Sequence, residues 1–218
     1  MRTSREIYEK YNIMPALQLH QLRVAAVAKL ICGNFTKPLN ANEVILVCLF
    51  HDMGNIIKSD LSVFPEFLEP EGREYWEKVK AEYAKKYGTD QHAASQMIAR
   101  EIELSETVAG YIGLIGFSHA LEILEGDSFE KKICEYSDMR VGPHGVLSLE
   151  DRIAEGRKRY IARKGDVSTD WKDRFERLSG IEKKLEKQIF AETTIVPEDI
   201  NDETVEPLIE ELQNYSVA

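Results

Sequence analysis

Cysteine is scarce in this chain of 218 residues, and its placement is irregular. The three cysteines, Cys32, Cys48 and Cys134, are odd in number, and no two of them form a CxxC pair. A disulfide framework uses an even set of cysteines at regular spacing, which this chain does not have. We therefore expect reduced, buried thiols of the kind found in cytoplasmic proteins.

Long hydrophobic runs are also missing. No apolar stretch approaches the roughly 18 residues that a membrane-spanning helix needs. The first residues, MRTSREIYEKYNIM, contain no apolar core of a signal peptide. We therefore expect a soluble, intracellular chain without a membrane partner.

Positive charge is in deficit, since the formal net charge is -10. A nucleic-acid surface needs a basic patch to neutralise phosphates, so the composition argues against a general nucleic-acid partner. A small anionic substrate is still compatible, because a metal ion or a few arginines can reverse the local field. The chain also has no glycine-rich phosphate loop, internal repeat or low-complexity block.

Helical periodicity and helix-capping residues recur along nearly the whole chain. Leu17, Val24, Val27 and Ile31 repeat at helical spacing, and no stretch alternates convincingly with the period of a strand. Segment 44–50 is short enough for either a helix or a strand, but the capping-box pattern before it favours a helix. The sequence predicts an all-α fold, with helices over residues 17–33, 44–50, 73–87, 90–102, 106–118, 129–140, 149–163 (stopped by Gly165) and 168–190 (interrupted at Gly180).

The chain beyond Ile195 is strongly acidic, with the sequence PEDINDETVEPLIEEL close to its end. A run of like charge is usually a solvated face. We expect a peripheral helix or a partly mobile end here, and not a functional site.

The chain has five histidines, and four of them lie in predicted helices: His20, His51, His92 and His119. His20 continues the apolar stripe of its helix, and His119 continues the stripe of the helix over 106–118. A single imidazole on an apolar face is more often a core histidine. Four inward imidazoles without a shared partner would cost on the order of 1–3 kcal/mol each in unmet hydrogen bonds. A metal ion removes that cost, because neutral imidazole is its commonest ligand.

Two aspartates accompany these histidines. Asp52 follows His51 directly, in LFHDMGN, and Gly54 would let the chain turn away from an ion at the helix end. Asp138 lies on a helix near the apolar Ile133 and Cys134, where a carboxylate needs a cation or several donors.

The order of these residues resembles the HD superfamily of metal-dependent phosphohydrolases. LHQLRVAAVA is similar to the family's opening His-x-x-Arg helix, HDMGN to its HD-x-G-Lys turn, and KICEYSDMRV to the segment with the closing aspartate. The resemblance implies an HD-domain-like helical bundle over residues 1–165, with a C-terminal helical extension over 166–218 packed on or next to it. It also implies that His20, His51, Asp52 and Asp138 bind one divalent metal ion.

Members of this family with two metal ions use two further histidines, and His92 and His119 fall where these are expected. In the alternative interpretation, His92 caps its helix or faces solvent, and one ion binds. Histidine and carboxylate ligands suit Fe, Mn, Co, Zn or Mg, and the sequence does not choose among them. His144 is not expected to be a ligand. Asn55 stands where the family has lysine, which leaves the rate or the substrate class in question. Lys58, one turn later, is the candidate to supply that charge instead.

The ligand set predicts hydrolysis of a small phosphoester, such as a nucleotide or nucleotide-like compound, by metal-activated water. We expect Asp52 and Arg23 to be catalytic, because Asp52 can accept a proton and Arg23 lies one turn from His20. The substrate-binding candidates are Arg23, Lys58, Arg140 and Arg152. For the helix that carries Arg152, the alternative is a solvated face paired with Glu150 and Glu155.

Two other functions use the same ligands: a di-iron oxygenase of HD type, and a metal-binding regulatory module whose site is vestigial. Specificity would come from the loop over 60–71 and from Tyr75, Trp76 and Tyr83, which either stack on a base or pack against the core. The chain could form a homo-oligomer.

Overall fold

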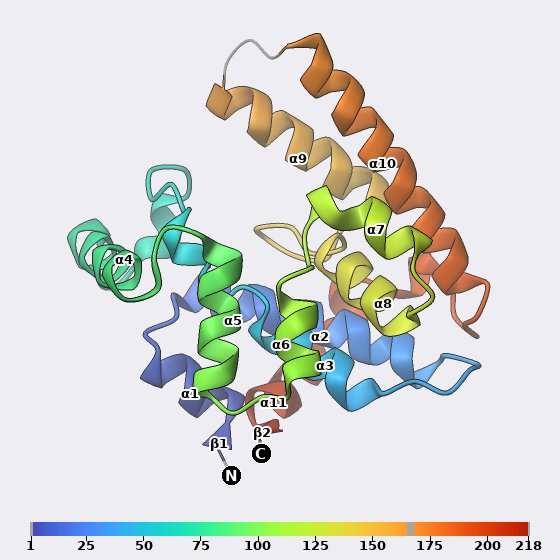
Figure 1. Ribbon diagram of the computed structural model, residues 1–218, viewed down its shortest axis with the longest axis horizontal. Helices are drawn as coiled ribbons and strands as arrows, with labels where there is room; N and C mark the ends of the chain where they lie inside the picture. Colours follow the sequence, from blue (N-terminus) through green and yellow to red (C-terminus); the bar gives the residue numbers. More distant parts are fainter. Residues whose placement is uncertain (1, 165–167, 218) are drawn as a thin grey trace.

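The computed structural model describes residues 2–164 and 168–217, and their fold is all-α, as predicted (Figure 1). The strands, β1 (Arg2–Thr3) and β2 (Ser216–Val217), are two residues long each and pair antiparallel near the two ends of the chain. The helices are α1 (Ser4–Lys10), α2 (Pro15–Gly33), α3 (Ala41–Phe50), α4 (Arg73–Tyr87), α5 (Gln91–Glu101), α6 (Glu106–Ile112), α7 (Ala120–Glu125), α8 (Phe129–Asp138), α9 (Leu149–Lys164), α10 (Thr169–Phe190) and α11 (Asp202–Gln213).

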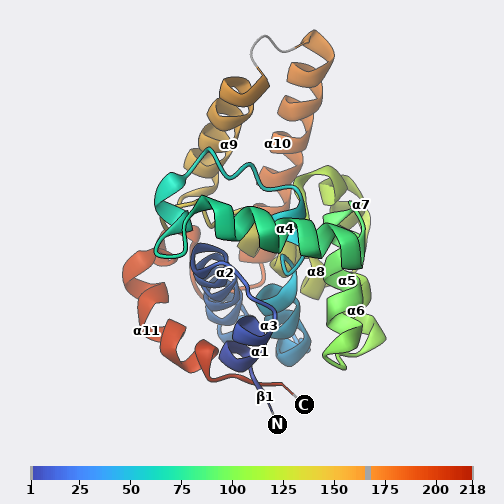
Figure 2. The same ribbon diagram turned by 90° about the vertical axis from the view of Figure 1, so that its left-hand side faces the viewer.

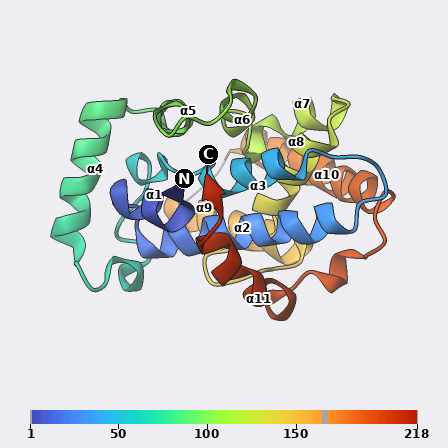
Figure 3. The ribbon, with the colours of Figure 1, turned by 90° about the horizontal axis from the view of Figure 1, so that it is seen from below.

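Helices α2 and α3 form the centre of the main core. Helix α2 packs against α3, α8 and α11, and α3 also contacts α6 and α8 (Figure 3). The buried faces of both helices consist of aliphatic residues such as Val24, Val27 and Val47. Removing this apolar surface from water is the main contribution to the stability of the fold. The close packing of the two central helices also holds their polar residues in fixed positions.

Helices α9 and α10 project from this core as an antiparallel arm (Figures 1 and 2). The second half of α10 returns to the body and packs on α7 and α8. There Leu178, Ile181 and Leu185 form a smaller apolar cluster with Ala120 and Ile123 of α7. Helix α10 runs through Gly180 without the predicted interruption. The expected stop at Gly165 and the proposed boundary at 165/166 lie outside the described residues, so the division into two domains stays a prediction.

The helix predicted over 106–118 is shorter than expected. It ends at Ile112, where Gly113 is the C-cap, and Gly116 follows with a positive φ of +144°. Residues Phe117–His119 then form a separate 3-10 turn, η3, before α7. His119 is therefore not the continuation of the Val108–Ile112 stripe. It is placed by this turn.

The acidic end of the chain forms a packed helix. Asn201 caps α11 by accepting a hydrogen bond from the Thr204 backbone N–H. Val205, Ile209 and Leu212 then turn inward, and α11 lies against α2. Of the two expectations for this segment, the peripheral helix is the one that forms, because its apolar residues repeat at helical spacing among the acidic ones.

Within residues 2–164 and 168–217, no single helix has both the length and the apolarity to cross a bilayer. The bent pair Glu106–Ile112 and Phe117–Glu125 passes the same criterion jointly, with an angle of 95° between its two parts.

Candidate metal centre

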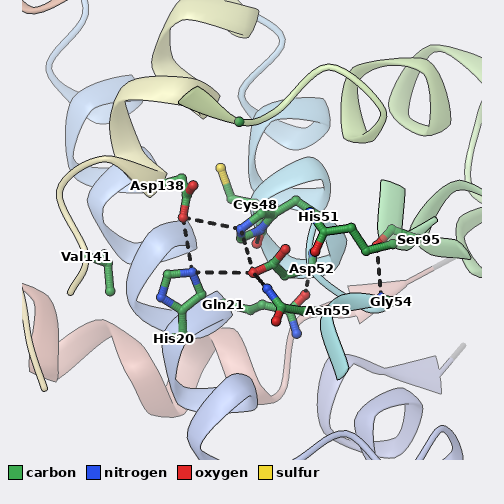
Figure 4. A network of polar contacts seen from close by, with 12 residues as sticks. His20, Gln21, Cys48, His51, Asp52, Gly54, Asn55, Ser95, Asp138 and Val141 are labelled. Atoms are coloured by element: carbon green, nitrogen blue, oxygen red, sulfur yellow. Dashed lines mark hydrogen bonds and ion pairs between the residues drawn. The ribbon is translucent and has the colours of Figure 1, made fainter. Parts of the chain in front are cut away.

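Three segments far apart in the sequence bring four polar side chains together (Figure 4). His20 comes from the first half of α2, His51 and Asp52 follow α3 directly, and Asp138 is the last residue of α8. His20 Nε2 lies 3.1 Å from Asp138 Oδ1 and 3.9 Å from Asp52 Oδ2. His51 Nε2 lies 3.5 Å from Asp138 Oδ1 and 3.8 Å from Asp52 Oδ2. The two imidazoles and the two carboxylates thus face one small volume.

The turn that holds His51 and Asp52 is fixed by its neighbours. The Asp52 backbone N–H donates to the side chain of Gln21, which follows His20 on α2. Gly54 donates its N–H to Ser95 Oγ of α5, and a Cβ atom at Gly54 would lie 2.4 Å from the Gln91 carbonyl oxygen. The φ of Gly54 is an ordinary -92°. The glycine is therefore required by the close approach of α5, and not by the turn that the sequence suggested.

The hydrogen bonds of His51 leave its second nitrogen suited to bind a metal ion. Nδ1 donates to the Cys48 carbonyl oxygen at 2.9 Å, so in the neutral ring the lone pair is on Nε2. Nε2 is buried and has no hydrogen-bond partner among the described residues. A backbone carbonyl that orients the far side of a histidine is the usual second shell of a metal-binding imidazole. The residues present therefore fit a divalent cation.

The electrostatics of the four groups favour a positive charge between them. Burial lowers the pKa of His51, but the charges of Asp52 and Asp138 outweigh burial and raise this pKa to about 9. Burial raises the pKa of Asp138, and the hydrogen-bonded His20 and the nearby imidazole of His51 bring it well below its ordinary value. Both shifts show carboxylates that attract a cation into this volume.

A family model described as HD domain matches residues 18–138, more than half of the chain and all four of these residues. The chain belongs to the HD-domain family. No match was found among curated proteins or among solved structures. HD domains are in general metal-dependent hydrolases, and the ligand atoms of His20, His51 and Asp52 lie within 4.8 Å of one another, close enough to hold a metal ion.

The other two histidines of the predicted HD-domain ligand set lie apart from this group. His92 of α5 and His119 of η3 lie edge to face, with ring centroids 6.3 Å apart and 82° between the ring planes. Burial and the ammonium of Lys58 lower the pKa of His92, against an opposing effect of Asp52. His92 thus lies within electrostatic range of Asp52. Its role as a ligand of a second ion, like that of His119, stays a prediction.

Asn55, which replaces the lysine of the HD-domain pattern, contacts the aspartate of the HD pair. Its amide donates to Asp52 Oδ2 at 2.6 Å, and its own carbonyl oxygen accepts from Ser59 Oγ at 3.0 Å. Asp52 Oδ2 is the same oxygen that faces both imidazoles. Asn55 therefore orients the carboxylate.

We expect Asn55→Ala to weaken metal binding about 10- to 100-fold, the usual effect of losing an outer partner of a ligand. Without the amide donor, Asp52 can rotate away from His20 and His51. Metal titration followed by calorimetry measures the change. Asn42→Ala, which removes an exposed asparagine amide at the start of α3, is the matched control. Equal affinity in the two variants would show that Asn55 does not orient Asp52.

Arg140 was expected to contact substrate, and this prediction is wrong. Its side chain is buried, at 3 % exposure. Its guanidinium donates to the Leu147, Pro197 and Ile200 carbonyl oxygens and to the Tyr136 hydroxyl. Through these hydrogen bonds, Arg140 joins the end of α8 to the segment before α11. Arg140 is therefore a structural residue.

Arg23 and Arg152 differ in how their guanidinium groups are used. Arg23 is half-buried on α2, and its Nε has no hydrogen-bond partner among the described residues. Arg152 donates from Nε to the Val141 carbonyl oxygen and pairs with Glu155 at 2.9 Å. The predicted pairing with Glu155 thus exists, but Arg152 also lines a cavity, described below.

The aromatic candidates of the sequence divide by burial. Trp76 and Tyr83 are buried on α4, where they donate to the Leu68 and Tyr11 carbonyl oxygens, so they pack against the core. Tyr75 is exposed. His144 lies against Phe64 and Phe67 of the 60–71 loop, with ring centroids 5.6 and 5.5 Å away.

Two buried glutamates were missed by the sequence reasoning. Glu135 of α8 and Glu182 of α10 are both at 0 % exposure, and Glu135 also accepts a 2.6 Å hydrogen bond from the Gly116 N–H. Burial and the charge of Asp138 raise the pKa of Glu135 to about 7, and burial and Glu135 raise the pKa of Glu182 well above its ordinary value. The signal was present: Glu182 lies inside the apolar stripe of Leu178, Ile181 and Leu185.

We expect Glu182→Gln to stabilise the metal-free protein at pH 8 by on the order of 2 kcal/mol. Because the pKa of Glu135 rises from 4.5 to about 7 on folding, the folded state binds more protons than the unfolded state. The stability from this pair is thus complete below the unfolded pKa and is lost as pH rises through about 7. An amide at 182 removes the repulsion between two carboxylates.

Thermal unfolding between about pH 5 and pH 8 tests this expectation. The unfolding midpoint of the wild-type protein should fall as pH rises, and that of the variant should fall less. Glu176→Gln changes an exposed glutamate of the same helix and should follow the wild-type curve. Parallel curves for wild type and Glu182→Gln would contradict the expectation.

Proposed function

We propose that the protein is a metal-dependent phosphohydrolase that acts on a small phosphoester, such as a nucleotide. The observation that carries the proposal is the convergence of His20, His51, Asp52 and Asp138 around the buried, unpaired Nε2 of His51. A divalent metal ion held there would lower the pKa of a bound water toward neutrality and polarise a phosphoryl oxygen.

The protein's own groups supply the remaining parts of such a reaction. Asp52 presents Oδ2 to both imidazoles and would accept the proton of the attacking water. The transition state of phosphoryl transfer is anionic, so cationic donors next to it matter most. Arg23, one turn from His20, has an unpaired guanidinium Nε for this purpose. Lys58 is exposed and close enough to His92 to lower its pKa.

We also propose His92 and His119 as ligands of a second ion. Their rings lie edge to face with centroids 6.3 Å apart, and burial and Lys58 lower the pKa of His92, which favours the neutral ring that binds metal ions. A two-metal site would stabilise both the attacking and the leaving oxygen. Metal analysis of the purified protein decides between one and two ions per chain.

Metal removal and restoration test the function. We expect the chelated protein to release no phosphate from a panel of nucleotides and simple phosphoesters, and to regain activity with at least one of Mn, Co, Fe, Zn or Mg. Phosphate release that is unaffected by chelation would refute the proposal. Oxygen consumption by an iron-loaded protein, with no phosphate released, would favour the di-iron oxygenase instead.

A further inference from the structure

A cavity of about 420 Å³ lies between α9, α10 and the segment that carries His119. This volume is within the range of small-molecule binding sites. Its walls are mostly aromatic and aliphatic, with two arginines, and consist of Phe117, Ser118, Met139, Arg152, Ile153, Gly156, Tyr160, Trp171, Arg174, Phe175 and Leu178.

The cavity is linked to the candidate metal centre through α8. Met139, which is part of its lining, follows Asp138 directly at the end of this helix. Arg152 forms a second link, because it donates to the Val141 carbonyl oxygen, and the Val141 N–H in turn donates to the Asp138 carbonyl oxygen. Ser118, on another wall, precedes His119, which we propose as a ligand of a second ion.

The aromatic rings of the cavity form a continuous series. Tyr160 and Trp171 are stacked with centroids 4.1 Å apart and 11° between their planes, and Trp171 stacks on Phe175 at 5.0 Å. Phe175 contacts Phe117 at 5.2 Å, which carries the series to the segment beside His119. Aromatic side chains stack on bases of any identity, because every base has a π-face.

Gly156 enlarges the cavity from the α9 side. Glycine in the middle of a helix costs about 1 kcal/mol relative to alanine, so its presence in α9 requires a local reason. A Cβ atom there would meet Arg152 Nη1 at 3.3 Å and nothing else within 4 Å. Because Gly156 also lines the cavity, a side chain added at this position has that space to enter.

Two arginines, Arg152 and Arg174, line the cavity in a protein with a formal net charge of -10. Because Arg152 is paired with Glu155, the positive charge of this lining comes mainly from Arg174. A cation there raises the local concentration of an anionic ligand. We infer that the cavity binds the planar aromatic part of the substrate, of nucleobase type, while the phosphate lies at the metal centre. This inference rests on the proposed phosphohydrolase function for the phosphate end only.

Ring binding can be measured without catalysis. Adenosine is titrated into the metal-free protein, and the fluorescence of Trp171 is followed, with Trp171→Phe defining the contribution of the buried Trp76. We expect adenosine to quench Trp171 and ribose, which has no aromatic ring, to leave the signal unchanged. Gly156→Leu should weaken adenosine binding about 10-fold or more, as expected for a lost stacking surface. Gly180→Leu, at an open position on α10, is the matched control.

Kinetics provide the second measurement. With the restored metal, Gly156→Leu should lower kcat/KM for adenosine monophosphate about 10-fold more than for ethyl phosphate, because only the first uses the cavity. Equal changes for both esters, or no quenching by adenosine in the wild-type protein, would overturn the inference. The two proposals can fail separately. Quenching of Trp171 without hydrolysis of any phosphoester would refute the proposed function but not the ring-binding cavity. Hydrolysis of phosphoesters without quenching would refute the cavity but not the function.

Discussion

His51→Ala is expected to lose metal binding and activity together. The substitution removes Nε2, the buried atom that we propose as a metal ligand and that lies 3.5 Å from Asp138 Oδ1 and 3.8 Å from Asp52 Oδ2. A metal ion supplies several kcal/mol of transition-state stabilisation, so we expect phosphate release to fall by about 10³-fold or more. Metal content per chain and phosphate release are measured on the same preparation.

His144→Ala is the control for this variant. His144 is exposed and contacts Phe64 and Phe67, outside the group of four ligand residues. It should keep its metal content and its fold. Retained turnover in His51→Ala, with a folded protein, would refute the metal centre as the source of activity.

Arg23→Ala is expected to reduce kcat/KM about 10²- to 10³-fold, the typical effect of removing a donor that stabilises transition-state charge. Arg23 is one turn from His20 on α2, and its buried Nε has no partner in residues 2–164 and 168–217. It is not a ligand, so metal content should stay at the wild-type level. That combination separates Arg23 from His51, whose loss lowers both quantities.

Two further variants sharpen the result. Arg23→Lys keeps the charge but loses the planar guanidinium fork, so it should restore part of the activity. Arg100→Ala removes an exposed arginine of α5 that pairs with Glu106, and it should behave like the wild-type protein. Full activity in Arg23→Ala would show that its unpaired guanidinium has no part in the reaction.

Much of this protein could be predicted from short-range sequence patterns. Helix periodicity and caps act within one or two turns, which is why the start of α4 at Arg73 and its end at Tyr87 agree with the prediction. The order of His20, His51–Asp52 and Asp138 was also sufficient to indicate the family. The prediction was weakest where glycines shorten a helix, as at Gly113 and Gly116, because an apolar stripe continues across both residues.

Other features depended on contacts between distant parts of the chain. Arg140 and Arg23 both lie close in sequence to a proposed ligand residue. The guanidinium of Arg140 donates hydrogen bonds to the carbonyl oxygens of Pro197 and Ile200, whereas Nε of Arg23 has no hydrogen-bond partner among the described residues. The pairing of Glu135 with Glu182 depends in the same way on how α10 returns onto α8.

The sequence by itself determined the all-α class, the helix boundaries set by local caps, and the ligand types that enter the HD-domain site in order. The tertiary structure alone decided the free Nε2 of His51, the orientation of Asp52 by Asn55, the burial of Arg140 and the cavity beside Gly156. The physical reason is range. Helix formation and capping depend on neighbours a few residues away, whereas hydrogen-bond partners and cavities depend on how helices far apart in the chain cross.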